Sequence, residues 1–247
     1  MATSTRAVMR ERVVIVTGST SGIGEATALA FARAGDHVVF NSVHSVEAGN
    51  ERASSTPGSL YVQGDISRGE DCDRIIATTL EHFGRLDVLV NNAGTTKKID
   101  HHDLESANLD VWREIFEVNV FGTWNLSVKA MDALRTSKGV IINVSSVAGS
   151  HSGGSSIPYS ASKAALNQMT ALLAKAMGPE VRVNAVAPGL IATPWTQSWQ
   201  RTHDYVSATA PLRRSGTPED VAEVIMALAD SSYVTGQVVT VDGGLML

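Results

Sequence analysis

The sequence predicts an α/β fold, in which helices cover both faces of a seven-stranded parallel sheet. Three observations lead to this prediction. Seven short apolar runs recur along the 247 residues, and most are continuous Val/Ile stretches, typical of strands buried on both faces. Helical patterns separate these runs. No linker or low-complexity segment interrupts the alternation, so we expect a single doubly wound domain.

The expected strands can be placed by number, and several end in glycine or asparagine. They span residues 12–18, 37–43, 60–65, 86–94, 139–146, 181–189 and 237–244. Ligands of doubly wound folds bind beyond the carboxyl ends of the strands. We therefore expect the functional site at that edge of the sheet.

Helix signals lie between the strands. Segment 22–35 ends at Gly35, a suitable glycine for the position after a helix, and segment 68–84 follows the third strand. Thr217 is the expected N-cap of the last helix, 217–230, with proline and acids in its first turn. The longest helices are expected at about 108–136 and 158–177.

Composition excludes several classes of protein. A net charge of −5 argues against nucleic acid as a partner, and no apolar run approaches the roughly 18 residues of a membrane span. Cys72 is the only cysteine, and His101 and His102 have no obvious third ligand, so we expect no metal site. Residues 1–12 lack the apolar core of a secretion signal, and we interpret them as a frayed tail of a cytoplasmic protein.

A glycine-rich turn, "TGSTSGIG", joins the first strand to the first helix. Gly18, Gly22 and Gly24 allow a tight turn and a close approach of the backbone to a ligand. The helix that follows offers free N–H groups to a phosphate. The spacing differs from the GxGxxG fingerprint, and by itself it indicates either a phosphate site or an ordinary turn.

Tyr159 and Lys163 lie four residues apart in "PYSASKAALNQM" and share one helix face. A surface neighbour pair is one interpretation. The other is chemical. The ordinary pKa of a tyrosine phenol is about 10, and a cation held near it lowers this pKa by favouring the phenolate. No charged residue precedes Lys163 in this segment to cancel the effect.

Six motifs occur in order along the chain: the glycine turn, "NNAG" (91–94), Asn119, "SS" (145–146), "YSASK" and "PG" (188–189). With this spacing, the chain resembles the short-chain dehydrogenase/reductase family over nearly its whole length. Its pattern is most similar to the 3-oxoacyl-(acyl carrier protein) reductase group and to relatives acting on ketones and secondary alcohols. The resemblance implies a single NAD(P)-binding Rossmann domain over 1–247, with a substrate lid at about 194–212.

The resemblance also implies catalytic roles. Tyr159 would be the general acid/base for hydride transfer between a nicotinamide cofactor and a carbonyl or alcohol, and Lys163 would acidify it. Ser146 would orient the carbonyl, with Ser145 as its rival. Asn119 would anchor a water of a proton relay, or would be a buried amide that bonds a helix carbonyl at a kink.

For the cofactor, the resemblance assigns the pyrophosphate to the glycine turn, the adenine to Asp65 and the nicotinamide carboxamide to Thr193. Ser42 stands where NAD-preferring members carry an acid, which favours NADP, with NAD possible; His44 is the nearby candidate cation. The cofactor-binding set is Gly18, Ser21, Gly22, Ile23, Gly24, Ser42, Asp65, Ile66, Asn92, Ala93, Gly94, Tyr159, Lys163, Pro188, Gly189, Ile191 and Thr193.

Substrate contacts are expected from Ser146, His151, Tyr159, Trp195 and Trp199. On a helical lid the two tryptophans would share a face, either covering a hydrophobic or aryl carbonyl or packing the lid onto the body. His151 either touches substrate or is simply exposed.

The alternative activity is reduction of a 3-oxoacyl chain on an acyl carrier protein. That partner is acidic, and scattered arginines (201, 213 and 214) are the candidates to meet it. A non-enzymatic NADP-binding protein is less favoured, because the Tyr–Lys pair is present. The resemblance further implies a homotetramer built through the fourth and fifth helices, which are the long ones expected at about 108–136 and 158–177.

Overall fold

The computed structural model describes residues 11–247, so the expected tail lies almost wholly outside the described residues. All seven expected strands form one parallel sheet in the order β3-β2-β1-β4-β5-β6-β7. They are β1 (Val13–Val16), β2 (His37–Ser42), β3 (Leu60–Gln63), β4 (Val88–Asn91), β5 (Val140–Val144), β6 (Arg182–Pro188) and β7 (Val238–Val241). The order reverses between β1 and β4, the point at which such sheets open a ligand crevice.

The strands are shorter than expected at their carboxyl ends. Segment 86–94 contains β4 only at Val88–Asn91, and segment 139–146 contains β5 only at Val140–Val144. The residues that follow leave the sheet and turn into the crevice. Asn92 and Ala93, for example, donate their backbone N–H groups to the Thr17 hydroxyl at the start of the glycine turn.

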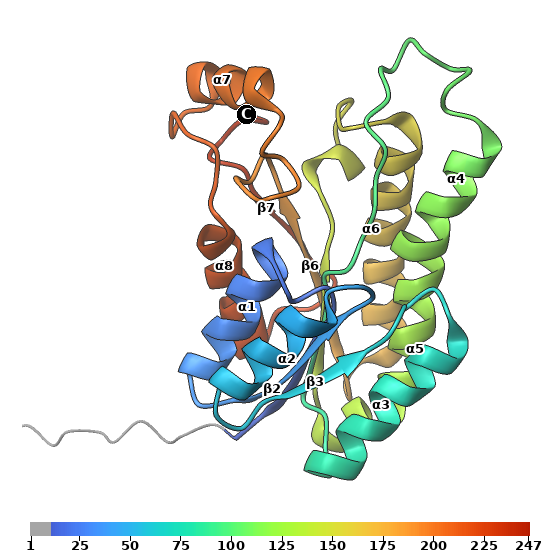
Figure 1. The fold of residues 1–247 in the computed structure, drawn as a ribbon, viewed down its shortest axis with the longest axis vertical. Helices are drawn as coiled ribbons and strands as arrows, with labels where there is room; N and C mark the ends of the chain where they lie inside the picture. The colour runs from blue at the N-terminus through green and yellow to red at the C-terminus, as the bar shows by residue number, and fades with distance from the viewer. Residues whose placement is uncertain (1–10) are drawn as a thin grey trace, which may run out of the picture.

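Helices flank the sheet on both sides, as Figure 1 shows. One layer holds α1 (Gly22–Arg33), α2 (Val46–Ser55) and α8 (Pro218–Asp230); the other holds α3 (Gly69–Phe83), α4 (Leu109–Phe116), α5 (Thr123–Ser137) and α6 (Ile157–Met177). The short helix α7 (Gln200–Thr209) lies above the carboxyl edge of the strands.

Two apolar cores explain the continuous Val/Ile runs, because alternate strand residues face opposite layers. On β1, Ile15 packs with Ile75, Leu126 and other residues of the α3–α6 layer. Its neighbours Val14 and Val16 pack with the α1–α8 layer. Each central strand is therefore apolar on both faces.

The helix ends follow the sequence signals. Thr217 caps α8 in a reciprocal capping box with Asp220, and α3 stops at Gly84, which has a φ of 73°. The helix expected at 108–136 is interrupted by a π-helical segment, Glu117–Gly122, between α4 and α5. Among the described residues, none of the helices combines the length and apolar character that a membrane crossing requires.

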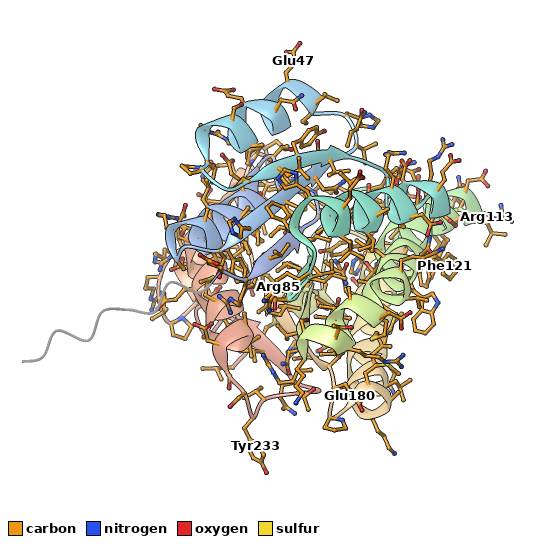
Figure 2. The ribbon with its side chains drawn as sticks, turned by 90° about the horizontal axis from the view of Figure 1, so that it is seen from below. Glu47, Arg85, Arg113, Phe121, Glu180 and Tyr233 are labelled. Carbon is orange, nitrogen blue, oxygen red and sulfur yellow. The ribbon has the colours of Figure 1, made fainter. Side chains whose placement is uncertain are left out.

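Helix α4, the π-helical segment and α5 together form one long rod, residues 109–137, which we call the α4–α5 rod. Its outer face carries exposed apolar side chains. Phe121 projects from the surface in Figure 2, and Trp124 and Val128 are also exposed. The family resemblance implies a tetramer built through the α4–α5 rod and α6, and that assembly stays a prediction.

A row of buried polar side chains crosses the α3–α6 side of the sheet. The Asn91 amide donates to the Asn143 carbonyl oxygen (2.9 Å) and to the Ser127 hydroxyl (3.1 Å). Asn143 in turn donates to Thr170 on α6 (2.9 Å). The row joins β4 and β5 to α5 and α6 directly below the crevice.

We expect Asn143→Ala to lower the free energy of unfolding by about 2–3 kcal/mol, because it leaves buried partners of Asn143 with fewer hydrogen bonds. Urea unfolding followed by circular dichroism measures the change. Asn50→Ala, at an exposed position on α2, is the control and should lie within about 0.5 kcal/mol of the parent. Equal stability of the two variants would contradict the structural role of the row.

Candidate active site

A cleft of about 1260 Å³ opens at the carboxyl edge of the sheet. Its walls come from the residues that follow the strands β1 to β6, and from the lid region around α7. Cavities for one drug-sized ligand span about 300–1,000 Å³. This cleft has room for a long ligand and a second small molecule beside it.

The glycine turn forms the floor of the cleft next to α1. Gly18 and Gly22 have φ values of +61° and +56°, which side-chain-bearing residues rarely adopt. A Cβ on the buried Gly24 would collide with the Gly18 carbonyl and the Asn92 amide. Gly24 therefore supports the turn from beneath, while Ser21, Gly22 and Ile23 line the cleft.

The N-terminus of α1 is open to a ligand. The N-cap residue Ser21 makes no side-chain cap hydrogen bond, so the first N–H groups of α1 keep their capacity to donate into the cleft. Backbone donors and the positive end of a helix dipole suit a diphosphate. The turn thus fits the pyrophosphate of a dinucleotide.

Asn92 holds this turn against the end of β4. Its amide donates to the carbonyls of Thr17 (2.8 Å) and Gly18 (3.1 Å). The Thr17 hydroxyl accepts from the backbone N–H groups of Asn92 and Ala93. The Asn92 side chain is thereby engaged in structure, and Ala93 and Gly94 present their backbone to the cleft.

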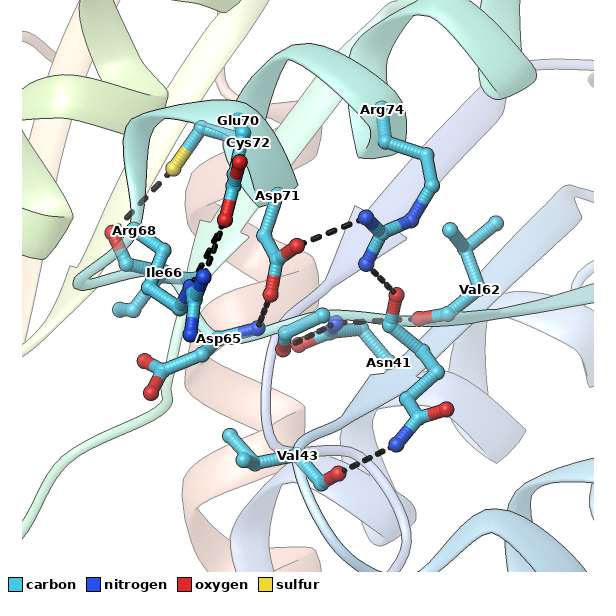
Figure 3. Close-up of polar contacts among 12 residues, drawn as sticks. Asn41, Val43, Val62, Asp65, Ile66, Arg68, Glu70, Asp71, Cys72 and Arg74 are labelled. Carbon is cyan, nitrogen blue, oxygen red and sulfur yellow. Dashed lines mark hydrogen bonds and ion pairs between the residues drawn. The ribbon is translucent and has the colours of Figure 1, made fainter.

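Figure 3 shows the far end of the cleft, where hydrogen bonds hold the ends of β2 and β3 together. Asn41 donates to the carbonyls of Val62 and Gly64 (both 3.1 Å). The Asp65 N–H donates to Asp71 (2.8 Å), and this bond is the main reason that the pKa of Asp71 is lowered. Asp65 and Ile66 are fixed at the cleft wall as a result.

The end of β2 carries no carboxylate. Ser42 lines the cleft there, and its hydroxyl is hydrogen-bonded to the Tyr61 hydroxyl (2.9 Å). The next residues along, Val43 and His44, also line the cleft. Among the described residues of the lining, the carboxylates are Asp65 and Asp100, which lie on other loops.

The start of α6 places Tyr159 and Lys163 in the middle of the cleft. The Ser156 hydroxyl caps the helix by accepting from the Tyr159 N–H (3.4 Å), and Pro158 occupies the first turn. Tyr159 is half-buried and Lys163 is 5% exposed. The Lys163 Nζ lies 5.7 Å from the centre of the Tyr159 ring and donates to the Val144 carbonyl at 2.8 Å.

The two serines after β5 point in different directions. Ser146 is hydrogen-bonded to the Tyr159 phenol and also accepts from the Ala148 N–H (3.2 Å). The Ser145 hydroxyl instead contacts Asn167 Oδ1 (2.5 Å) and the Lys163 carbonyl (3.3 Å). Ser146 is thus the hydroxyl paired with Tyr159.

Burial controls the electrostatics of this pair. It raises the pKa of Tyr159 above the ordinary value of 10.0, and the hydrogen bond from Ser146 only partly offsets it. Burial also lowers the pKa of Lys163 from 10.5 to about 8. In this structure the Lys163 ammonium donates to the Val144 carbonyl and burial dominates the pKa of Tyr159, so the acidification of the phenol by Lys163 stays a prediction.

Asn119 lies in the π-helical segment and is 1% exposed. Its side chain accepts from the Thr95 N–H (2.8 Å) and donates to the Thr95 carbonyl and the Ser162 hydroxyl (both 3.0 Å). These bonds tie the segment to the loop after β4 and to α6. They are not bonds to a carbonyl of its own helix, and Asn119 is not part of the cleft wall among the described residues.

The residues that are predicted to contact the nicotinamide lie at the end of β6 or come directly after it. Pro188, Gly189, Ile191 and Thr193 all line the cleft, and a Cβ on Gly22 would meet the Thr193 side chain at 3.3 Å. The sequence-predicted residues of the glycine turn and of this segment therefore face each other.

The lid differs from expectation in one respect. Trp195 and Trp199 do not share a helix face, because residues 194–198 form a turn and α7 begins after Trp199. Both still line the cleft. The Trp195 ring meets Tyr159 edge-on, with centroids 6.4 Å apart, and the Trp199 ring faces the Lys98 ammonium at 5.0 Å.

Other contacts were missed or not formed. His151 is exposed and does not appear in the cleft wall of the described residues. Lys98, Tyr205, Leu245 and Met246 do line it. Lys98 lies four residues after the "NNAG" motif and Tyr205 lies within the expected lid, whereas the C-terminal residues carry no local signal.

Comparison with known proteins adds independent findings. A family model described as enoyl-(acyl carrier protein) reductase matches residues 18–246. A Streptomyces violaceoruber protein, named as a ketoacyl reductase of the granaticin polyketide synthase, is 52% identical over 95% of this chain and 96% of its own. A 3-oxoacyl-[acyl-carrier-protein] reductase from Thermotoga maritima is 37% identical, covering 96% and 98%.

Solved structures agree with the sequence matches. A short-chain dehydrogenase/reductase structure from Brucella melitensis, named glucose/ribitol dehydrogenase, superposes with a TM-score of 0.90 at 30% identity, covering 96% of this chain and 97% of its own. One from Burkholderia xenovorans has a TM-score of 0.88 at 33% identity, covering 96% and 98%.

The buried ammonium of Lys163 predicts a specific pH dependence of stability. The pKa in the folded state is depressed, so the unfolded chain binds more protons between pH 8 and 10.5, and this residue makes stability rise with pH in that window. Relative to Lys163→Met, the parent protein should gain about 2 kcal/mol of unfolding free energy between pH 7 and 9.5. Urea unfolding at both pH values measures it; an unchanged difference between the two proteins would contradict the burial effect.

Proposed function

Because this chain belongs to the short-chain dehydrogenase/reductase family and is an oxidoreductase, we propose that it interconverts a ketone and a secondary alcohol, with NADP as the hydride carrier and Tyr159 as the general acid/base. The observation that carries the proposal is the pairing of Ser146 with the Tyr159 phenol inside the cleft, with the Lys163 ammonium one helical turn away. A catalytic hydroxyl, a proton donor and a cation converge on one small volume.

The cleft fits a dinucleotide along its whole length. The glycine turn and the open N-terminus of α1 would hold the pyrophosphate, and Asp65 and Ile66 would meet the adenine. Ala93 and Gly94 would support the adenosine ribose, and Thr193 would bond the carboxamide. When bound, NADPH would supply the hydride for reduction and NADP⁺ would accept it in the reverse direction; the remaining chemistry belongs to the side chains.

In the reduction direction, the substrate oxygen would lie between Ser146 and Tyr159. The Ser146 hydroxyl would donate to this oxygen as negative charge develops on it. Tyr159 would then pass its phenolic proton to the same oxygen, forming the alcohol. The raised pKa of Tyr159 keeps the phenol protonated at neutral pH, which suits reduction.

Lys163 and Asn119 would support the proton transfer. In the structure the Lys163 ammonium bonds the Val144 carbonyl, and a Cβ on Gly94 would lie within 4 Å of both Lys163 Nζ and Asn119 Oδ1. The two polar groups therefore flank the same short backbone segment. A relay that returns a proton to Tyr159 would pass through Lys163, with Asn119 fixing the Thr95 loop beside it.

The cofactor preference follows from the end of β2. A carboxylate there would repel a 2′-phosphate and bond a free ribose hydroxyl. This position holds Ser42, with His44 as a neighbouring group that can carry positive charge. NADP is therefore the proposed cofactor over NAD.

The lining of the lid side supports an apolar or aryl substrate. Four aromatic residues, Tyr159, Trp195, Trp199 and Tyr205, line the cleft with Ile99 and Leu190 among others. The alternative is a 3-oxoacyl thioester on an acyl carrier protein, which the names of two relatives favour. Of the arginines expected to meet that acidic partner, Arg214 is paired with Asp220 and Arg213 with the Ala208 carbonyl.

We expect Tyr159→Phe to reduce kcat by about 10²–10⁴-fold, because the proton donor is lost, while the Kd of NADPH stays within about twofold. NADPH oxidation is measured with aryl ketones, simple ketones and 3-oxoacyl thioesters, which also ranks the substrate classes. Tyr233→Phe, at a fully exposed tyrosine, is the control. Turnover by Tyr159→Phe at the parent rate would refute the acid/base assignment.

The parent enzyme should show a higher kcat/KM with NADPH than with NADH, and Ser42→Asp should reverse the order, since a carboxylate repels the 2′-phosphate. Initial rates with each cofactor at fixed substrate give the comparison. A preference of the parent for NADH above about tenfold, roughly 1.4 kcal/mol, would overturn the NADP proposal.

A further inference from the structure

His203 links helix α7 both to the lid turn at Thr196 and to the body of the protein at Ser215. This half-buried residue of α7 has Nδ1 at 2.7 Å from the Ser215 hydroxyl and Nε2 at 3.1 Å from the Thr196 carbonyl. We infer that His203 is a positioning residue, which sets the lid turn and, through it, Thr193 of the nicotinamide side. The inference rests on the proposed function only for what binds beside Thr193.

The chemistry of the two contacts fixes how the ring is held. The Thr196 carbonyl can only accept, so Nε2 carries a hydrogen and donates to it. The Ser215 hydroxyl can donate to a neutral Nδ1 or accept from a protonated one. Both contacts persist in either charge state, and the imidazole acts as a constant brace between the two residues.

The Thr196 side chain connects the residue that His203 holds to the wall of the cleft. Its hydroxyl donates to the Ile191 carbonyl (2.5 Å) and accepts from the Thr193 N–H (3.2 Å). Thr193 lines the cleft opposite Gly22. A displacement of Thr196 therefore moves a residue that faces the cofactor side of the cleft.

Ser215 is a firm point of attachment. It precedes Gly216, whose N–H donates to the Leu190 carbonyl (2.9 Å) and whose carbonyl accepts from the Ala192 N–H (2.8 Å). The next residues form the capped start of α8. Ser215 thus belongs to the body of the protein, and His203 connects the lid to it.

Among the described residues, helix α7 itself has few other anchors, because Val206 is its one buried residue. The lid beyond it is held by the buried Ala210 and by the Leu212 N–H, which donates to the Gly243 carbonyl (3.1 Å). The turn before α7 rests on the Trp195–Tyr159 ring contact and on the Trp199–Lys98 contact. Because so little apolar surface holds α7, two hydrogen bonds to one ring are a large part of its attachment.

The test begins with the protein free of cofactor. Hydrogen exchange of amides in residues 194–209 should be about tenfold faster in His203→Ala, since two hydrogen bonds of ordinary net strength are lost. With cofactor and substrate, the KM for NADPH should rise about five- to tenfold while kcat stays within about threefold. Gln200→Ala is the matched control, because it removes a side-chain bond within α7, to Asp204, and no link to the body.

Further variants separate bracing from general destabilisation. Ser215→Ala should reproduce a smaller part of both effects, and the double variant should equal His203→Ala alone, because the two side chains act through one contact. His203→Asn, which keeps a polar group near Nδ1, should lie between the parent and His203→Ala. If His203→Ala does not fold, faster lid exchange in Ser215→Ala still decides the question.

Two results would overturn the inference. One is unchanged exchange of 194–209 in His203→Ala and Ser215→Ala; the other is equal exchange and KM changes in the Gln200→Ala control. Failure of the proposed function is distinct from these, because it would appear as full turnover by Tyr159→Phe and leave the cofactor-free exchange data unaffected.

Discussion

Burial of the central strands on both faces is the constraint on which the site depends. Ile15 packs into one core while Val14 and Val16 pack into the other, so the middle of the sheet has no surface left for chemistry. Polar groups gather where parallel strands end, and all seven strands end at the same edge. The parallel sheet alone therefore brings three parts of the site together: the glycine turn, Ser146 and the Pro188–Thr193 segment.

Some polar side chains are nevertheless buried inside the protein, directly beneath the site, and their burial costs stability. The Asn91–Asn143–Thr170 row is buried, and its hydrogen bonds limit the cost, although the buried Asn91 Oδ1 accepts none among the described residues. Lys163 is different, because burial lowers its pKa to about 8 while its ammonium donates a hydrogen bond to the Val144 carbonyl. A buried amine with a strongly shifted pKa beside a phenol is the kind of costly group that gathers at functional sites.

Much of this arrangement could be predicted from the sequence. Continuous Val/Ile runs located all seven strands, and the family-like spacing brought Ser146, Tyr159 and Lys163 to one cleft. The conformation of residues 194–198 could not be predicted. Hydrogen bonds of Thr196 with Ile191 and His203 accompany a turn there, so Trp195 and Trp199 do not share a helix face. The direction of the Tyr159 pKa shift was also out of reach, since it depends on burial and not on spacing.

The π-helical segment between α4 and α5 has a consequence for the phasing of the whole rod. Successive residues of an α-helix are about 100° apart around the axis. The additional residue of a π-helical turn therefore rotates the side chains of α5 around the axis relative to those of α4. The rod can thus present α4 to α6 and α5 to α3 at once, with Asn119 directed at Thr95 between them. Deleting a single residue there would restore a regular helix and leave one of these two interfaces facing water.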